Sequence, residues 1–213
     1  MEAQSLASQL KEKRSEMIVS ELEAVALRLF DERGFGEVNV EEIASTAGIS
    51  VRTFYRYFGA KEDVLQVRID KRNEVVGMAL RARPADEAPL RSLRLALEEE
   101  AATVDTTLLR RWIAVISSTP AVLRGVVGGL HLKTHPIIAG FFATRLDVPA
   151  DSLVPTMLAA AAVGVIQAAT TQWFFRGGDL ATTMSESFAV LESGIGTDWV
   201  PGSAGSGPPK RLT

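Results

Sequence analysis

The stretch that most constrains the fold of this chain runs from Asn39 to Lys61 and reads NVEEIASTAGISVRTFYRYFGAK. Asn39 is a favourable helix N-cap, and the Glu42 carboxylate stands three residues later, where it can complete a capping box. Gly48 predicts the end of this helix, because glycine enters the left-handed C′ conformation without a Cβ penalty. Ser50 can cap a second helix. Two short helices around a glycine turn predict a helix-turn-helix, whose second helix can enter the DNA major groove.

The second of these helices has a composition that suits DNA. No acidic residue lies between Val51 and Lys61, and guanidinium and hydroxyl groups crowd into two turns. Arginine can bind guanine edges or phosphate, and threonine and tyrosine hydroxyls can donate to phosphate oxygens. The alternative is a pair of packed helices whose aromatic residues serve only the core. We favour DNA binding, with the candidate residues Arg52, Thr53, Tyr55, Arg56, Tyr57 and Lys61.

A longer pattern of fixed spacing runs through the same region. It reads Ile43-Ala44-x-x-Ala47-Gly48-Ile49-Ser50-x-x-Thr53-Phe54-Tyr55-x-Tyr57-Phe58-x-x-Lys61-x-x-Val64-Leu65, and it is preceded by Ala26-x-x-Leu29-Phe30-x-x-x-Gly34-Phe35. This pattern resembles the TetR family of transcriptional regulators. The resemblance covers residues 18 to about 65, and the rest of the chain agrees with the family only in length and helical character.

The resemblance implies an all-α protein, in which an N-terminal three-helix helix-turn-helix head is joined to a helical-bundle body for ligand binding and dimerisation. Its partners would be a palindromic double-stranded DNA operator, a second copy of the chain and a small-molecule effector of unknown identity. The function implied is a repressor that an inducer releases. By match to the family, Thr53, Tyr55, Tyr57 and Lys61 would hold phosphates, Val51, Arg52 and Arg56 would face base edges, and Asn39 would lie at the same interface.

Composition divides the 213 residues into four expected segments. Residues 1–14 are polar and mixed in charge and are expected to form a flexible arm, whose cations either reach DNA or stay solvated. Residues 15–62 would form the head, with its first helix starting near Ile18, and residues 63–200 the body. Residues 201–213 are rich in proline, glycine and serine and are expected to be disordered.

Apolar periodicity predicts that the body is a series of helices, the last two being residues 152–175 and 180–194. Glycines and Pro136 predict either one bent helix or two pieces over residues 120–145. The acidic run Glu98–Glu100 is expected to be solvated surface. The last two helices are expected to pair with a second subunit, with residues 159–164, Phe188 and Leu191 as the seam; an intramolecular core is the alternative.

Charge and composition exclude several classes of protein. The net charge is −3, so the cations of the second helix form a local patch rather than the general basic surface of a nucleoid-coating protein. The chain has no cysteine, and its N-terminus lacks the apolar core of a signal peptide. Residues 152–175 carry no charge, but Pro155 and amide and hydroxyl side chains interrupt them, so we expect no membrane partner and a cytoplasmic location.

His131 and His135 lie four residues apart, a spacing found in metal sites, but no third ligand is evident. We therefore expect no metal and no cofactor, and we place both histidines among the candidates for a ligand pocket. The candidate pocket residues are Trp112, Ile116, His131, His135, Phe142, Gln167 and Trp173. As a set they suggest a largely apolar ligand, although for any single aromatic or aliphatic member plain core is the better interpretation.

No P-loop, GxSxG, HExxH or paired-carboxylate pattern occurs, so the sequence predicts no catalytic residue and no enzyme. A DNA-processing enzyme would need acidic metal ligands or a nucleophile, and residues 108–175 contain almost no carboxylate. The stronger alternative is a DNA-binding regulator without a small-molecule inducer, whose body serves only dimerisation or protein contacts.

Overall fold

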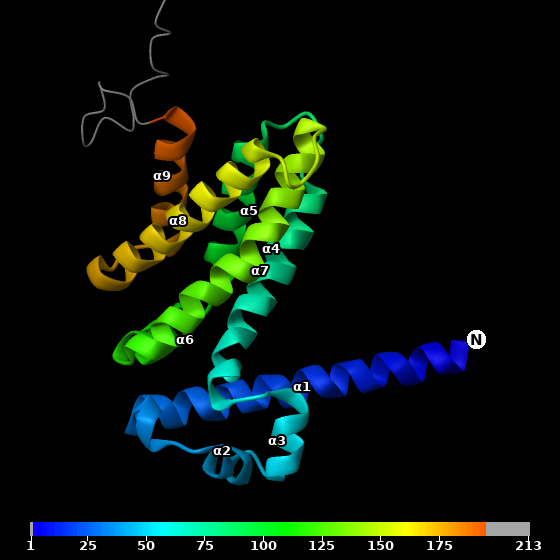
Figure 1. Ribbon diagram of the computed structural model, residues 1–213, viewed down its shortest axis with the longest axis vertical. Helices are drawn as coiled ribbons and strands as arrows, with labels where there is room; N and C mark the ends of the chain where they lie inside the picture. Colours follow the sequence, from blue (N-terminus) through cyan, green and yellow to red (C-terminus); the bar gives the residue numbers. More distant parts are fainter. Residues whose placement is uncertain (1, 195–213) are drawn as a thin grey trace, which may run out of the picture. The chain divides into compact units, whose positions relative to one another are not determined.

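The computed structural model describes residues 2–194, with side chains from residue 8 (Figure 1). Within this range every regular element is a helix, as the all-α prediction requires. The tail predicted to be disordered, residues 201–213, lies outside the described residues.

The chain forms two compact units, each assembled from two separate stretches of sequence. Unit 1 combines the residues up to Lys71 with Thr107–Gly129. Unit 2 combines Arg72–Thr106 with the residues from Leu130 onward. Two long helices run from one unit into the other, so the predicted division of the chain after residue 62 remains a prediction.

The first part of unit 1 contains three α-helices and two short 3₁₀ helices. They are α1 (Glu2–Arg33), η1 (Phe35–Glu37), α2 (Val40–Thr46), α3 (Val51–Tyr57) and η2 (Lys61–Gln66). The helix α1 begins at Glu2 and not near Ile18, so residues 2–14 are helical and the expected start of the first helix is corrected. The flexibility expected of residues 1–14 stays a prediction. Residues 8–14 are all exposed, and most of them are good helix formers.

The core of this part lies between α1, α2 and α3. The side chains of Leu22, Phe30, Ile43 and Phe54 are almost fully buried there. Unit 1 is completed by α6 (Thr106–Ser118) and by the first part of α7 (Pro120–Leu146). The Trp112 indole N–H of α6 donates to the backbone oxygen of Leu65 at 3.0 Å, which ties α6 to the end of η2.

Unit 2 packs the rest of α7 with the part of α4 (Val67–Ala82) that follows Lys71 and with α5 (Pro89–Thr103), α8 (Leu153–Arg176) and α9 (Leu180–Ser193). Its core contains Leu93, Leu97, Ile138, Phe142, Ile166, Met184 and Phe188. The helix α7 is continuous through Pro136, so the two-piece alternative is wrong. Proline has no backbone N–H, so the Leu132 carbonyl, four residues before Pro136, lacks its helical donor. Both residues are exposed, so water can donate the missing hydrogen bond.

The acidic run on α5 was predicted to be solvated surface, and the structure shows that its three carboxylates form ion pairs with arginines. Glu98, Glu99 and Glu100 pair with Arg94, Arg83 and Arg72 respectively, at 3.4, 3.0 and 3.4 Å. Only 12% of the Glu100 side chain is exposed. Glu100 therefore links α5 to α4 inside unit 2, and the prediction is wrong for this residue.

Candidate DNA interface and effector body

The start of α2 has the predicted capping box. The Asn39 side-chain oxygen accepts from the Glu42 backbone N–H at 2.8 Å, and the Glu42 carboxylate accepts from the Asn39 N–H at 3.1 Å. Arg33 of α1 donates to the other Glu42 oxygen at 2.6 Å. The Arg33 hydrogen bond and then the Asn39 N–H hold the pKa of Glu42 below its ordinary value. These contacts fix the beginning of α2 against the end of α1.

The turn and the cap of α3 also follow the sequence prediction. Gly48 has a φ of 68°, the left-handed conformation that favours glycine. The Ser50 hydroxyl oxygen accepts from the Thr53 backbone N–H at 3.1 Å, and the two hydroxyl oxygens lie 2.9 Å apart. Phe54 is fully buried beneath α3. The helix is therefore held at its first turn and along its inner side.

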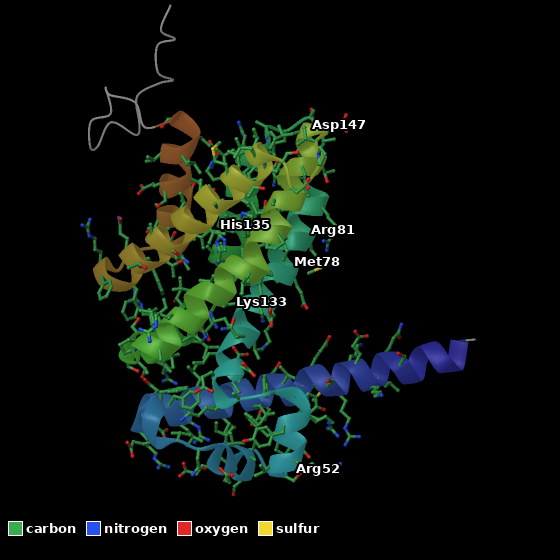
Figure 2. All side chains as sticks on the ribbon, in the orientation of Figure 1. Arg52, Met78, Arg81, Lys133, His135 and Asp147 are labelled. Atoms are coloured by element: carbon green, nitrogen blue, oxygen red, sulfur yellow. The ribbon has the colours of Figure 1, made fainter. Side chains whose placement is uncertain are left out.

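The outer side of α3 carries the predicted DNA-contacting side chains. Arg52, Tyr55 and Arg56 are exposed, and Arg52 projects from the first turn (Figure 2). Arg56 donates to the Tyr57 hydroxyl at 3.0 Å, and its guanidinium carbon lies 4.8 Å from the centroid of the Tyr57 ring. Val51, Thr53 and Tyr57 are partly exposed. The surface thus presents two guanidinium groups and several hydroxyl donors without an acidic neighbour on α3.

Two of the predicted DNA-contacting side chains make hydrogen bonds to other parts of the same chain. Asn39 caps α2, as described above. Lys61, the first residue of η2, is partly buried and donates to the backbone oxygens of Phe35 and Val38. Contact of either side chain with DNA stays a prediction.

The candidate pocket residues are distributed over both units. Trp112 and Ile116 are buried in unit 1. Phe142 and Trp173 are buried in unit 2, and the Trp173 indole N–H donates to the Gly178 oxygen at 3.1 Å. A pocket formed by the seven candidates together remains a prediction.

The two histidines lie on α7, with ring centroids 5.0 Å apart. His131 is exposed, and the Nε2 atom of His135 (Figure 2) is 3.0 Å from the Thr156 oxygen at the start of α8. No group of three or more potential metal ligands occurs among the described side chains.

A buried polar pair that the sequence did not single out joins α4 to α7. The Thr134 hydroxyl donates to the Asn73 side-chain oxygen at 2.9 Å, and both residues are less than one-tenth exposed. An isolated threonine and asparagine within long helices carry no local pattern. Only the packing of the two helices brings them together.

Two stretches of the amino-acid sequence match family models. Residues 23–67 match the model for bacterial regulatory proteins of the tetR family, and residues 87–196, more than half of the chain, match the MftR C-terminal domain. The chain belongs to the TetR family. The recognition of this family from the pattern around Ile43–Leu65 is therefore confirmed.

Curated TetR-family relatives align with most of the chain. The transcriptional regulator TcmR of Streptomyces glaucescens is 28% identical over 180 residues, which are 79% of this chain and 78% of TcmR. The putative mycofactocin biosynthesis transcriptional regulator MftR of Mycobacterium tuberculosis is 27% identical over 183 residues, 80% of this chain and 87% of MftR.

A solved TetR-family structure shares the fold. It is the repressor FadR of Thermus thermophilus in complex with lauroyl-CoA, with a TM-score of 0.55 and 22% identity, covering 86% of this chain and 97% of FadR. The chain is a TetR-family DNA-binding transcriptional regulator with a helix-turn-helix head and a helical body.

The helix α8 of this TetR-family chain presents an exposed, largely apolar side. Its exposed residues recur at helical spacing and are Met157, Ala160, Gly164, Ala168, Thr171 and Phe175. An open hollow on this side is lined by Gly164, Gln167, Ala168, Thr171, Gln172, Phe175 and Arg176. Ala159 and Phe188, which the sequence placed in a subunit seam, are fully buried in unit 2, so the intramolecular alternative holds for both.

Among the described residues, α8 alone is long and apolar enough to cross a membrane by length and composition, and 33% of its most apolar window is buried. Its hydropathy has another explanation, since α8 contributes Ala159, Ala162 and Ile166 to the core of unit 2.

Proposed function

We propose that this TetR-family regulator is a repressor that binds a palindromic operator as a homodimer and is released by a small, largely apolar ligand. The observation that carries the proposal is the outer side of α3. Arg52 and Arg56 are exposed there on a helix capped by Ser50 and anchored by Phe54. A rigid helix with exposed guanidinium groups can bind base edges in the major groove.

The exposed side of α8 supports the homodimer. Phe175 is 76% exposed and Met157 is 54% exposed, and small residues lie between them on the same side. Contiguous apolar surface of this kind commonly marks a protein interface, and glycine and alanine allow close helix approach. A two-fold dimer would place two α3 helices in successive major-groove turns, about 34–36 Å apart.

The apolar ligand is supported by the character of the body and by one relative. The described core of unit 2 is almost entirely aliphatic and aromatic. The Thermus thermophilus FadR was solved with lauroyl-CoA, which carries an acyl chain. A ligand that binds the released state more tightly would weaken operator binding through a coupling of about 1–3 kcal/mol.

A second candidate is a regulator without an inducer, whose body serves only dimerisation or protein contacts. The observation that favours it is the complete burial of Phe142 and Trp173, two predicted pocket residues, in the packed interior of unit 2. A thermal-shift screen separates the two candidates. A ligand that raises the melting temperature and lowers operator affinity supports the inducible repressor, and a screen without such a compound supports the second candidate.

The test of DNA recognition begins with selection of bound duplexes from a random pool at physiological salt. A two-fold symmetric site is expected, and a pool without enrichment would overturn the proposal. Arg52→Ala should then weaken operator binding by about 1–3 kcal/mol and relax specificity at one position in each half-site. Arg28→Ala, which removes an exposed charge from α1, is the control and should leave specificity unchanged. Equal weakening of Arg52→Ala on every sequence would make Arg52 a phosphate contact.

A further inference from the structure

Lys61 is bound differently from the arginines of α3. Its Nζ atom donates to the Phe35 backbone oxygen at 2.8 Å and to the Val38 backbone oxygen at 2.7 Å. The same atom lies 4.4 Å from the centroid of the Phe35 ring. An ammonium group has three N–H donors, so these contacts use two of them and turn the charge toward the protein.

The two carbonyl groups lie at the entry to the helix-turn-helix. Phe35 begins η1, the turn that links α1 to α2, and Val38 directly precedes Asn39, the cap of α2. Lys61 comes three residues after Phe58, the C-cap of α3. The ammonium therefore joins the chain just before the helix-turn-helix to the chain just after it, across separations of 26 and 23 residues.

The cap at the start of η2 does not involve the Lys61 side chain. The Asp63 carboxylate accepts from the backbone N–H groups of Gly59 and Ala60, at 2.9 Å each, and so caps the start of η2 without using Lys61. Phe35 and Val38 are both buried, and a buried carbonyl without a donor is unfavourable. Hydrogen bonds from a charged donor are stronger than neutral ones, so the ammonium is an effective partner for both.

We propose that Lys61 is a positioning residue of the DNA-binding head: it holds the two ends of the helix-turn-helix together and contacts no phosphate of its own. This replaces the phosphate contact that the family resemblance implies. Lys61 acts on DNA through α3, because its two hydrogen bonds fix the direction of α3 relative to the η1 turn.

The salt dependence of DNA binding distinguishes the two roles. A cation that binds a phosphate releases a counterion, so its removal lowers the slope of log K against log salt concentration by about 0.9. Lys61→Met keeps the length of the side chain and removes the ammonium. We expect the full-length variant to bind the selected operator about tenfold more weakly, with an unchanged slope, because ordering α3 releases no counterion.

Arg56→Met is the matched comparison, since it removes an exposed cation from α3 and should make the slope less steep. The melting temperature of Lys61→Met should fall, because the Phe35 and Val38 carbonyls lose their donor. A slope reduced by about 0.9 with an unchanged melting temperature would overturn the proposal and restore the phosphate contact.

A second measurement uses the unmodified protein and decides the question if Lys61→Met does not fold. Lysine acetylation by acetic anhydride, read by mass spectrometry, should modify Lys61 more slowly than the exposed Lys11 and Lys13 in the free protein. Addition of operator DNA should give Lys61 no further protection. Rapid modification of Lys61 that DNA suppresses would refute the positioning role. Failure of the protein to bind any duplex would overturn the proposed function, while the comparison in the free protein would still test Lys61.

Discussion

Replacement of Gln66 by methionine should stabilise the protein. The Oε1 atom of Gln66 is buried and has no hydrogen-bond partner among the described residues. The Nε2 atom makes only a long contact, 3.4 Å, with the Gly125 oxygen. The amide lies so close to α7 that a Cβ atom at Gly129 would approach Oε1 to 2.2 Å. The absence of a side chain at Gly129 therefore leaves space for the Gln66 amide, which nevertheless makes only one long hydrogen bond.

The magnitude follows from these contacts. A buried acceptor without a partner is unfavourable by about 1–3 kcal/mol, whereas a hydrogen bond as long as that to Gly125 contributes about 0.5 kcal/mol at most. Methionine keeps the length of the side chain and removes both groups. We expect Gln66→Met to raise the free energy of unfolding by about 1 kcal/mol, which corresponds to about 2–4 °C in melting temperature for a chain of this size.

Urea denaturation of the full-length protein, followed by circular dichroism, measures this change. Gln9→Met, at an exposed position of α1, is the control, because glutamine and methionine have nearly equal helix propensities. A loss of about 1 kcal/mol or more for Gln66→Met, with an unchanged control, would refute the reasoning. It would mean that the Gln66 oxygen is well paired in solution.

Three further predictions concern stability. Asn39→Ala removes the side-chain hydrogen bond that the Glu42 backbone N–H donates to Asn39 and keeps the bond from the Asn39 backbone N–H, and it should lower the free energy of unfolding by about 1 kcal/mol in urea denaturation. Phe142→Ala empties a fully buried site and should lower it by about 3–5 kcal/mol, far more than an alanine at an exposed position. Hydrogen bonds from Arg83 and then Ser92 lower the pKa of Glu87 from 4.5 to about 2. The stability that Glu87 contributes is therefore complete above pH 4.5 and is lost as the pH falls toward 2, so acid titration of Glu87→Gln should show a smaller decline in melting temperature over this window.

The helix-turn-helix was predictable from the sequence because local interactions determine it. The capping box of Asn39, the left-handed turn at Gly48 and the Ser50 cap each join residues no more than three positions apart or depend on one residue. The spacing of the apolar residues also placed the body helices close to their observed bounds. Patterns of this kind need no knowledge of tertiary structure.

The features that the sequence analysis missed depend on distant partners or on the absence of packing. The hydrogen bonds of Lys61 within the protein could not be predicted, because its acceptors lie 26 and 23 residues earlier in the sequence. Glu100 resembled solvated surface because its partner, Arg72, is 28 residues away. The start of α1 at Glu2 was not predicted because residues 8–14 are all exposed and therefore carry no periodic apolar side, which is the signal used to predict a helix.

The pocket was the least predictable feature, because aromatic residues suit a cavity and a packed core equally well. Trp112 shows why composition is insufficient. Its indole N–H is used by the Leu65 oxygen, a partner 47 residues away in sequence. Which of the candidate residues meets a ligand depends on the tertiary arrangement of long helices.

The composite make-up of unit 1 limits how this regulator can be recombined with others. A fusion that imports a foreign head up to residue 62 would separate Glu23 from Lys71, an ion pair of 2.6 Å, and Asp31 from Arg111. A junction after Lys71 would keep Glu23 with Lys71, but it would still separate Asp31 from Arg111 and Leu65 from its Trp112 donor. An exchange of operator specificity between paralogues, by engineering or by gene conversion, should therefore disturb fewer contacts if residues 107–129 are transferred together with the residues up to Lys71.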